Sequence, residues 1–306
     1  MKKQPIKYLK YFGLKLWLIE ASILVLNKLN IFNRIKEKLI IIKKNIINKY
    51  LTKKYNNVIS KYKNASIKNE KYSNKIFIFW WQNLEKADEI IKIAINSIKK
   101  QCTNKEIIII TKENIDLYYK MPKFIKEKFD NGEITLTHFS DILRMNLLRK
   151  YGGFWMDATI FLTSKPKLNQ EFTTIKFHTN EKTSISNGKW CGFYIGGKNQ
   201  LFYEFMVDFF NEYWKNESIM IDYFLIDYII NIAYNNIELI KEKFDNVPFN
   251  NEEIHKLCNI LNNEYNDTEW KKLTKNNYVH KLSYKKNIIK NNKDNYYNKI
   301  KNLNEM

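Results

Sequence analysis

Hydrophobic and polar residues follow different patterns in the N-terminal part of the chain and in the rest. Between residues 8 and 32, apolar residues recur at the spacing of a helix. One broad apolar face comprises Leu9, Phe12, Leu16, Ile19, Ile23, Leu26 and Ile31, with Trp17 at its edge. Residues 33–63 continue in the same style, with Ile, Leu and Tyr between lysines. The pattern predicts amphipathic helices, and the run from Leu14 to Leu26 is too short and too charged to span a bilayer.

After polar residues 63–74, which predict a linker, the pattern becomes that of an α/β protein. Continuous apolar runs at 75–81 and 106–110 are typical of strands buried on both faces of a parallel sheet. The spacing predicts further elements in chain order: helices at 87–100, 122–132 and 139–150, a strand at 154–162, and helices at 199–214, 220–234 and 251–262. This alternation predicts an α/β sheet flanked by helices.

Positive charge is concentrated at the N-terminal end. The chain carries a formal net charge of +20, and residues 1–71 hold 18 Lys and Arg against three Glu and no Asp. Basic residues beside an apolar face suit an anionic membrane surface. The alternative is a helical hairpin packed on the rest of the protein, with its lysines in water. No groove-reading or base-stacking motif accompanies the charge, so nucleic acid is not an expected partner.

Two charged residues stand three positions apart in an otherwise apolar predicted helix. Asp141 and Arg144 therefore share one side of helix 139–150, with Ser140 as a neighbour of its N-terminal cap. An exposed ion pair would contribute less than about 1 kcal/mol to stability. Because the helix is apolar around them, we expect the pair to face a cleft, where a guanidinium offers a planar fork of donors to phosphate or sugar oxygens.

A third charged residue, Asp157, follows the apolar run that begins after Gly152 and Gly153. Ligands of open α/β sheets gather at the carboxyl ends of strands. A carboxylate there can bind Mg²⁺ or Mn²⁺, which takes oxygen ligands and can bridge the phosphates of a nucleoside diphosphate. The three cysteines lie far apart without metal-type spacing, which is typical of reduced thiols in a cytosolic compartment.

The block from Ser140 to Thr159, with its Asp-Ile-Leu-Arg and Gly-Gly-Phe-Trp-Met-Asp-Ala-Thr segments, resembles the capsular polysaccharide synthesis family. That family is similar to the glycosyltransferases with a DXD sugar-binding region, which have a GT-A fold. The resemblance covers about residues 75–284, including the first strand up to Gln82 and a closing His280-Lys281-Leu282 segment. It implies a GT-A-like mixed sheet at 73–290, a basic amphipathic helical segment at 1–72, and a polar tail at 291–306.

The resemblance also implies roles for individual residues. Catalysis is assigned to Asp141, Arg144, Asp157 and Asp227, and nucleotide-sugar binding to Trp80, Trp81, Gln82, Ser140, Asp141, Arg144, Gly153 and Lys281. One of the two tryptophans would stack on the base, unless both are core residues. A divalent metal, Mn²⁺ or Mg²⁺, is assigned to Asp157, Thr159 and His280. Thr159 stands where related families have a second Asp. Its hydroxyl carries no charge, so the resemblance implies dependence on a metal less strongly than a full Asp-x-Asp motif would.

The resemblance implies transfer of a hexosyl group from a nucleoside diphosphate sugar, with UDP as the expected nucleotide, and retention at the anomeric carbon. The acceptor would be a capsular or cell-surface polysaccharide or a lipid-linked glycan. The enzyme would lie in the cytoplasm, peripheral at the inner face of the cell membrane. One alternative is a membrane-associated scaffold that binds sugar nucleotides at a degenerate site. A metal-dependent phosphodiesterase would need a denser cluster of Asp and His than this sequence contains.

Overall fold

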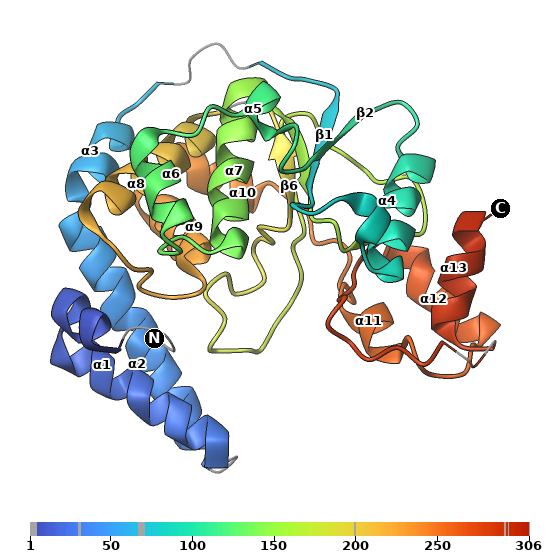
Figure 1. Cartoon of the computed structure of the whole chain (residues 1–306), viewed down its shortest axis with the longest axis horizontal. Coiled ribbons are helices and arrows are strands. Elements are labelled where there is room, and N and C mark those ends of the chain that lie inside the picture. Colours follow the sequence, from blue (N-terminus) through green and yellow to red (C-terminus); the bar gives the residue numbers. More distant parts are fainter. Residues whose placement is uncertain are drawn as a thin grey trace.

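The centre of the protein is a five-stranded mixed sheet (Figure 1). The computed structural model describes residues 5–29, 32–66, 71–198, 200–290, 292 and 294–305. Ile31 of the expected apolar face, residues 67–70 of the expected linker and 291, 293 and 306 of the expected tail lie outside these ranges. In sheet order the strands are β2 (Glu106–Ile110), β1 (Lys75–Phe79), β3 (Gly153–Met156), β6 (Tyr194–Gly197) and β5 (Phe172–Thr174).

Strand direction changes in the middle of this sheet. β1 pairs in parallel with both β2 and β3, whereas β6 pairs antiparallel with β3 and with β5. A second, two-stranded antiparallel sheet joins β4 (Ile160–Leu162) to β7 (Val279–Lys281). β4 follows β3 after a turn of three residues, so one short stretch of chain connects the two sheets.

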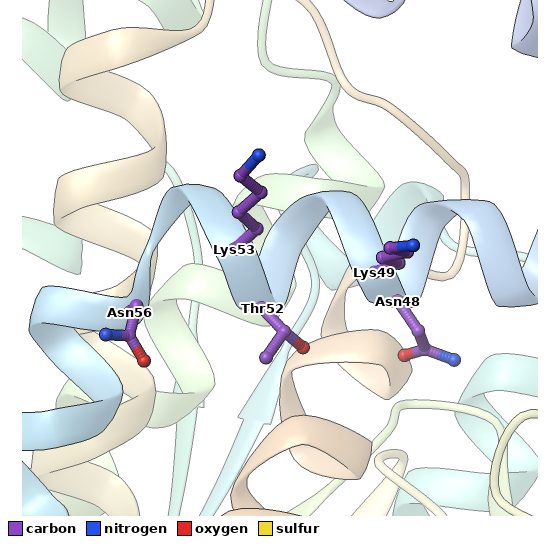
Figure 2. Close-up of a pocket in the computed structure, with 5 residues that line it drawn as sticks. All are labelled: Asn48, Lys49, Thr52, Lys53 and Asn56. Atoms are coloured by element: carbon purple, nitrogen blue, oxygen red, sulfur yellow. The ribbon is translucent and has the colours of Figure 1, made fainter.

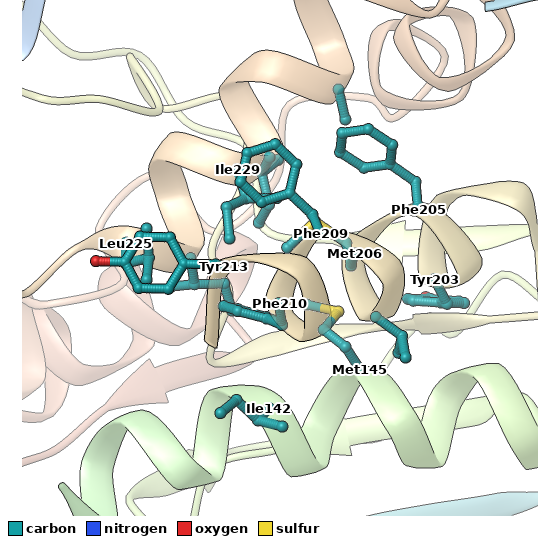
Figure 3. Close-up of a cluster of buried hydrophobic side chains, with 14 of the residues drawn as sticks. Ile142, Met145, Tyr203, Phe205, Met206, Phe209, Phe210, Tyr213, Leu225 and Ile229 are labelled. Atoms are coloured by element: carbon teal, nitrogen blue, oxygen red, sulfur yellow. The ribbon is translucent and has the colours of Figure 1, made fainter. Parts of the chain in front are cut away.

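Apolar side chains fill both faces of the central sheet. Alternate residues of a strand point to opposite faces. Phe77 and Trp155 belong to a core formed with α7 (Leu136–Tyr151), α8 (Leu201–Asn216) and α9 (Leu225–Asn236). Figure 3 shows aromatic and aliphatic side chains of these three helices meeting in that core. Ile76 and Phe154 belong to the core on the other face, which includes residues of α4 (Glu89–Gln101) and β4.

Three N-terminal helices pack against the core that contains α8. α1 (Pro5–Leu29) and α2 (Asn33–Lys54) form an elongated hairpin at one end of the molecule, and α3 (Asn56–Lys63) follows α2 and packs on α8 (Figure 1). α1 is kinked at Gly13, where φ is 82°. Most of the apolar face expected for α1 points into the fold: Leu16, Ile19 and Ile23 are buried, whereas Leu9 is exposed. None of the described helices is long and apolar enough to cross a membrane.

A second apolar row of α1 remains exposed. It consists of Leu14, Leu18, Val25 and Leu29, spaced by four, seven and four residues, and it is called the α1 stripe below. A surface hollow lies on α2 and the start of α3 (Figure 2). Polar side chains line it: Asn48, Lys49, Thr52, Lys53 and Asn56.

The remaining helices are short. They are η1 (Leu84–Lys86), α5 (Ile115–Tyr118), α6 (Lys123–Asp130), α10 (Glu238–Asp245), α11 (Lys256–Ile260), α12 (Asp267–Asn276) and α13 (Tyr296–Glu305). α11, α12 and α13 lie on the side of the molecule opposite the N-terminal hairpin, and α13 packs on α4 (Figure 1).

The expected α/β class is confirmed: a mixed sheet flanked by helices, with a helical N-terminal segment. The strand expected at 106–110 has those bounds. The single strand expected at 154–162 is wrong, because a turn at 157–159 divides it between the two sheets. The helix expected at 139–150 begins at Leu136, where Thr135 accepts a hydrogen bond from the backbone N–H of His138, so Ser140 does not adjoin the cap.

Candidate functional site

α7 places one acidic and one basic side chain on the same side, as their spacing predicted. Asp141 and Arg144 are both buried, and Arg144 Nη2 lies 3.3 Å from Asp141 Oδ1. The same Nη2 lies 3.2 Å from Oδ1 of Asp157. The guanidinium therefore bridges carboxylates from a helix and from the end of a strand.

Asp157 lies at the carboxyl end of β3, in the turn that leads to β4. Trp155, two residues earlier on the same face of the strand, donates from Nε1 to Asp157 Oδ1 over 2.8 Å. The Trp155 ring also lies 4.9 Å from the Arg144 guanidinium carbon, a cation–π contact. One buried indole therefore orients both the carboxylate and its cation.

Lys281 brings a second cation to Asp157 from a distant part of the chain. Its Nζ donates to Asp157 Oδ2 over 2.6 Å and lies 4.7 Å from the centre of the Phe193 ring. Burial acts to raise the pKa of Asp157, but the charges of Lys281 and Arg144 outweigh burial, so the pKa lies below its ordinary value. The carboxylate is therefore ionised at neutral pH and balanced by two cations.

Asp227 lies at the border of this group, in the first turn of α9. Its Oδ1 accepts a hydrogen bond of 2.9 Å from Trp190 Nε1. Burial raises the pKa of Asp227 to about 6; the Trp190 bond acts in the opposite direction, and the Asp141 charge adds to the effect of burial. Two residues after Trp190, a Cβ added to Gly192 would lie 3.0 Å from Arg144 Nη1. The 190–192 segment thus connects Asp227 with the bridging guanidinium.

The expected nucleotide-binding residues of the first strand lie at the same sheet edge. The parallel register pairs Phe77 with Trp155, so the residues after β1 follow alongside Asp157. Trp81 packs in the core, with its ring 5.6 Å from Phe129 and 6.1 Å from Phe139. Trp80 is half-buried and meets the exposed Tyr284 ring edge-on at 5.6 Å. Gln82 is exposed. Of the two tryptophans, Trp80 is the better placed to meet a base.

Two other expected binding residues do not contact this group. Gly153 begins β3, roughly 13 Å of strand away from Asp157 at about 3.3 Å per residue. Its φ is 85°, and an added Cβ would lie 2.5 Å from the Lys75 carbonyl oxygen, so this glycine permits close strand packing. Ser140 is half-buried, one residue and about 100° of helical turn from Asp141. Its role stays a prediction.

The expected metal ligands do not form a cation site in this chain. His280 is fully buried beside Phe161, with Nε2 3.5 Å from Thr163 Oγ1, and it points to the opposite face of β7 from Lys281. Burial lowers the pKa of His280 to about 4. Thr159 is buried, and its carbonyl accepts from Leu282 N–H. Within the described ranges, no three side chains of His, Cys, Asp and Glu are grouped to hold a metal ion.

Both oxygens of Asp157, the one remaining expected ligand, face cationic or N–H donors. A divalent ion at this carboxylate would be repelled by Arg144 and Lys281. The donor set therefore does not fit the metal that the resemblance implies, and metal dependence stays a prediction.

The sequence analysis assigned no role in the site to three residues that contact its charged groups. Trp155 could have been noticed from its position two residues before Asp157 on the same strand face. His138 stands three residues before Asp141; its Nδ1 is 3.5 Å from Asp141 Oδ2, and its Nε2 accepts from Trp214 Nε1 over 3.0 Å. The Phe193 carbonyl accepts from Asp157 N–H over 2.9 Å. The β3–β6 pairing places Phe193 beside Asp157, and no local sequence pattern indicates this contact.

These charged groups thus lie beyond the carboxyl end of a strand, where the ligands of open α/β sheets gather. The sequence matches the family described as capsular polysaccharide synthesis protein over residues 27–300, and the chain belongs to this family. The match supports a protein of capsular polysaccharide synthesis, the family expected from the sequence.

Among solved structures, the chain is similar to one described as "PaToxG Glycosyltransferase". The two share 16% sequence identity with a TM-score of 0.38, over 78% of this chain and 99% of that chain. Similarity of this extent does not determine activity. No curated protein matches the chain.

Proposed function

We propose that this protein transfers a hexosyl group from a nucleoside diphosphate sugar, with UDP as the nucleotide, to a hydroxyl of a capsular polysaccharide or lipid-linked glycan. The observation that carries the proposal is the meeting of Asp141, Arg144, Asp157 and Lys281 at the carboxyl end of β3. The group combines donors for phosphate oxygens with acceptors for sugar hydroxyls, and a nucleotide sugar presents both.

Each side chain has a chemical task in the proposed reaction. Arg144 and Lys281 bind the diphosphate, and the carboxylates of Asp141 and Asp157 accept hydrogen bonds from sugar hydroxyls. Trp80, beside Tyr284, stacks on the base, with Gln82 exposed next to it. Asp227 contacts the donor or acceptor sugar from the 190–192 side of the site.

The reaction breaks the bond between the anomeric carbon and the diphosphate oxygen, and the electron pair leaves with the nucleoside diphosphate. The acceptor oxygen forms the new bond to that carbon, and its proton passes to a phosphate oxygen or to water. Positively charged groups held at the diphosphate stabilise the charge that develops there, and fixed side chains keep donor and acceptor in reacting geometry. Retention at the anomeric carbon is the expected outcome, checked by nuclear magnetic resonance of the product.

Release of nucleoside diphosphate from a panel of nucleotide sugars, with glycan acceptors, tests the activity. We expect turnover of a UDP-sugar. Asp157→Asn lowers it by about 10²-fold or more, because the amide no longer holds Arg144 and Lys281, the groups that stabilise the charge on the diphosphate, in place. Asp130→Asn, at an exposed helix residue paired with Lys126, is the matched control and keeps wild-type turnover. Absence of turnover with every sugar would contradict the proposal; an active Asp157→Asn would contradict the site.

We further propose that the protein docks peripherally on the inner, anionic face of the cell membrane through the α1 stripe. Leu14 and Leu18 are exposed, and so are Lys15, Lys28 and Arg34 around the same hairpin. Apolar side chains with basic neighbours suit a surface of anionic lipids, where each cation adds about 1 kcal/mol. Docking there would keep the enzyme close to a lipid-linked acceptor.

A further inference from the structure

Both oxygens of Asp157, the carboxylate that a metal ion would need, already face positively charged side chains. Asp157 Oδ1 lies 3.2 Å from Arg144 Nη2 and accepts from Trp155 Nε1, while Oδ2 accepts from Lys281 Nζ over 2.6 Å. A divalent ion bound at Asp157 would lie beside both cations and be repelled by them. In the part of the chain that the structure describes, no cluster of acidic or histidine side chains offers the ion compensating ligands.

The two cations differ in how freely they can move. The Arg144 side chain is only 5% exposed, lies against the Trp155 ring and is in contact with both Asp141 and Asp157. The Lys281 side chain is 21% exposed and, besides Asp157, contacts the face of the Phe193 ring. Lysine carries a compact charge on a flexible stem with three rotatable donors, whereas guanidinium is a rigid fork. Lys281 can therefore turn toward an entering anion while Arg144 stays fixed.

A leaving nucleoside diphosphate requires nearby positive charge, and a bridging metal is one way to supply it. An ammonium group at the same carboxylate is another, because it neutralises phosphate oxygens with charge-assisted hydrogen bonds. Resting on the proposed function, we infer that Lys281 replaces the divalent ion: it pairs with Asp157 in the free protein and turns to the diphosphate of the donor, which binds without metal.

Titration calorimetry of the full chain with UDP, in EDTA and then with Mn²⁺ or Mg²⁺, tests this inference. We expect UDP to bind in EDTA, and either metal to change the Kd by less than about threefold. Lys281→Met weakens binding in EDTA by about tenfold or more, as loss of one charge-assisted hydrogen bond implies. Mn²⁺ alone, titrated into the free protein, gives no saturable binding.

Lys285→Met is the matched control, since Lys285 is exposed four residues beyond Lys281 and its loss changes net charge equally. It keeps the wild-type Kd, and the melting temperatures of both variants show whether they are folded. UDP binding that requires Mn²⁺ would overturn the inference and leave the proposed transferase intact. Binding in EDTA that survives Lys281→Met would overturn the role of Lys281. Failure of UDP to bind under any condition would overturn the proposed function as well.

Discussion

At the scale of single residues, Arg144 illustrates how backbone and side chains hold a charged group in one orientation. Its guanidinium is in contact with Asp141 and Asp157 and lies over the Trp155 ring. On a further side it faces the backbone of Gly192, where no side chain intervenes. A planar cation confined in this way keeps the orientation in which it would meet phosphate oxygens.

Gly192→Ala is expected to disturb this orientation without disturbing the fold. The new Cβ would lie 3.0 Å from Arg144 Nη1, so the guanidinium must shift by a few tenths of an ångström. Gly192 is not among the residues with positive φ, so alanine suits its backbone. We expect kcat/KM for the donor to fall by about threefold or more, since small displacements of positioning groups are costly. An unchanged kcat/KM, or a large drop in melting temperature, would contradict this account.

Asp227 gives the protein a specific dependence on pH. Its pKa is about 6 in the folded chain against an ordinary 3.8, so the native state binds this proton more tightly than the unfolded state. The free energy of unfolding therefore falls as pH rises from about 4 to about 6, by up to about 1.4 kcal/mol per unit. Asp227→Asn cannot titrate, while its amide oxygen still accepts from Trp190.

Urea unfolding of wild type and Asp227→Asn across this window measures the effect. We expect the variant to gain stability relative to wild type as pH rises, with a plateau above about pH 6. Parallel profiles would show that the carboxyl does not titrate in this range.

Sequence patterns anticipated some of these residues better than others. Asp141 and Arg144 share a helix, so their spacing alone predicted that they lie together, and the structure brings Asp157 to them. The contact with Lys281 depends on two sheets meeting, and only the resemblance suggested that residue. The resemblance assigned Gly153 and His280 to the site, but successive side chains of a strand point to opposite faces and successive residues lie farther along it.

At the scale of elements, predictions succeeded where apolar runs were long. The isoleucines of 106–110 define β2 without ambiguity. The run through Met156, Ala158 and Ile160 is buried throughout, so hydrophobicity could not reveal the turn at 157–159. β5, β6 and β7 have three or four residues each, too few for a periodic signal.

The segment between α8 and α9 is held by the N-terminal helices. Glu217 is fully buried, and its Oε1 accepts from Tyr50 over 2.8 Å, from Tyr55 over 3.0 Å and from Lys54 over 2.5 Å. Further along, Tyr8 Oη donates to the Ile221 carbonyl over 2.9 Å. The basic hairpin is thus part of the structure that leads into Asp227.

Glu217→Gln is expected to destabilise the protein by about 1–3 kcal/mol, because Lys54 loses its charged partner and a buried amide N–H₂ replaces Oε2 without an acceptor. Glu204→Gln, at an exposed position of α8, is the control and changes stability by less than about 0.5 kcal/mol. Chemical denaturation compares the two. Equal stability of both variants would show that the Glu217 contacts contribute little.

At the scale of the whole molecule, the hairpin combines two surfaces. Its inner side contributes Ile47 and Leu51 to the main core. The α1 stripe is exposed on the other side, and the exposed basic residues Lys15, Lys28 and Arg34 lie on the same hairpin. Removing the hairpin to test membrane docking would therefore expose the core, and point changes on the outer side are the cleaner experiment.

Leu18→Glu is expected to weaken sedimentation with anionic vesicles by about tenfold or more, because burial of a leucine is worth about 1.5–3 kcal/mol and the new charge is repelled. Leu117→Glu, at an exposed leucine of α5, makes the same chemical change elsewhere and serves as control. Wild-type binding should also fall with salt and on neutral vesicles. Equal sedimentation of the two variants would exclude the α1 stripe as the docking face.

The pairing of β7 with β4 has a consequence for folding fidelity. Lys281, the last residue of β7, lies opposite Ile160, and its neighbours in the chain are His280 and Leu282. A slip of one position would turn the ammonium into the apolar interior and set an imidazole or an isobutyl group against Asp157. Misaligned pairing would bury the Lys281 charge without a partner and leave Asp157 with Arg144 as its one cation. The ion pair between Lys281 and Asp157 thus favours the observed register of the two strands, because only that register compensates the Lys281 charge.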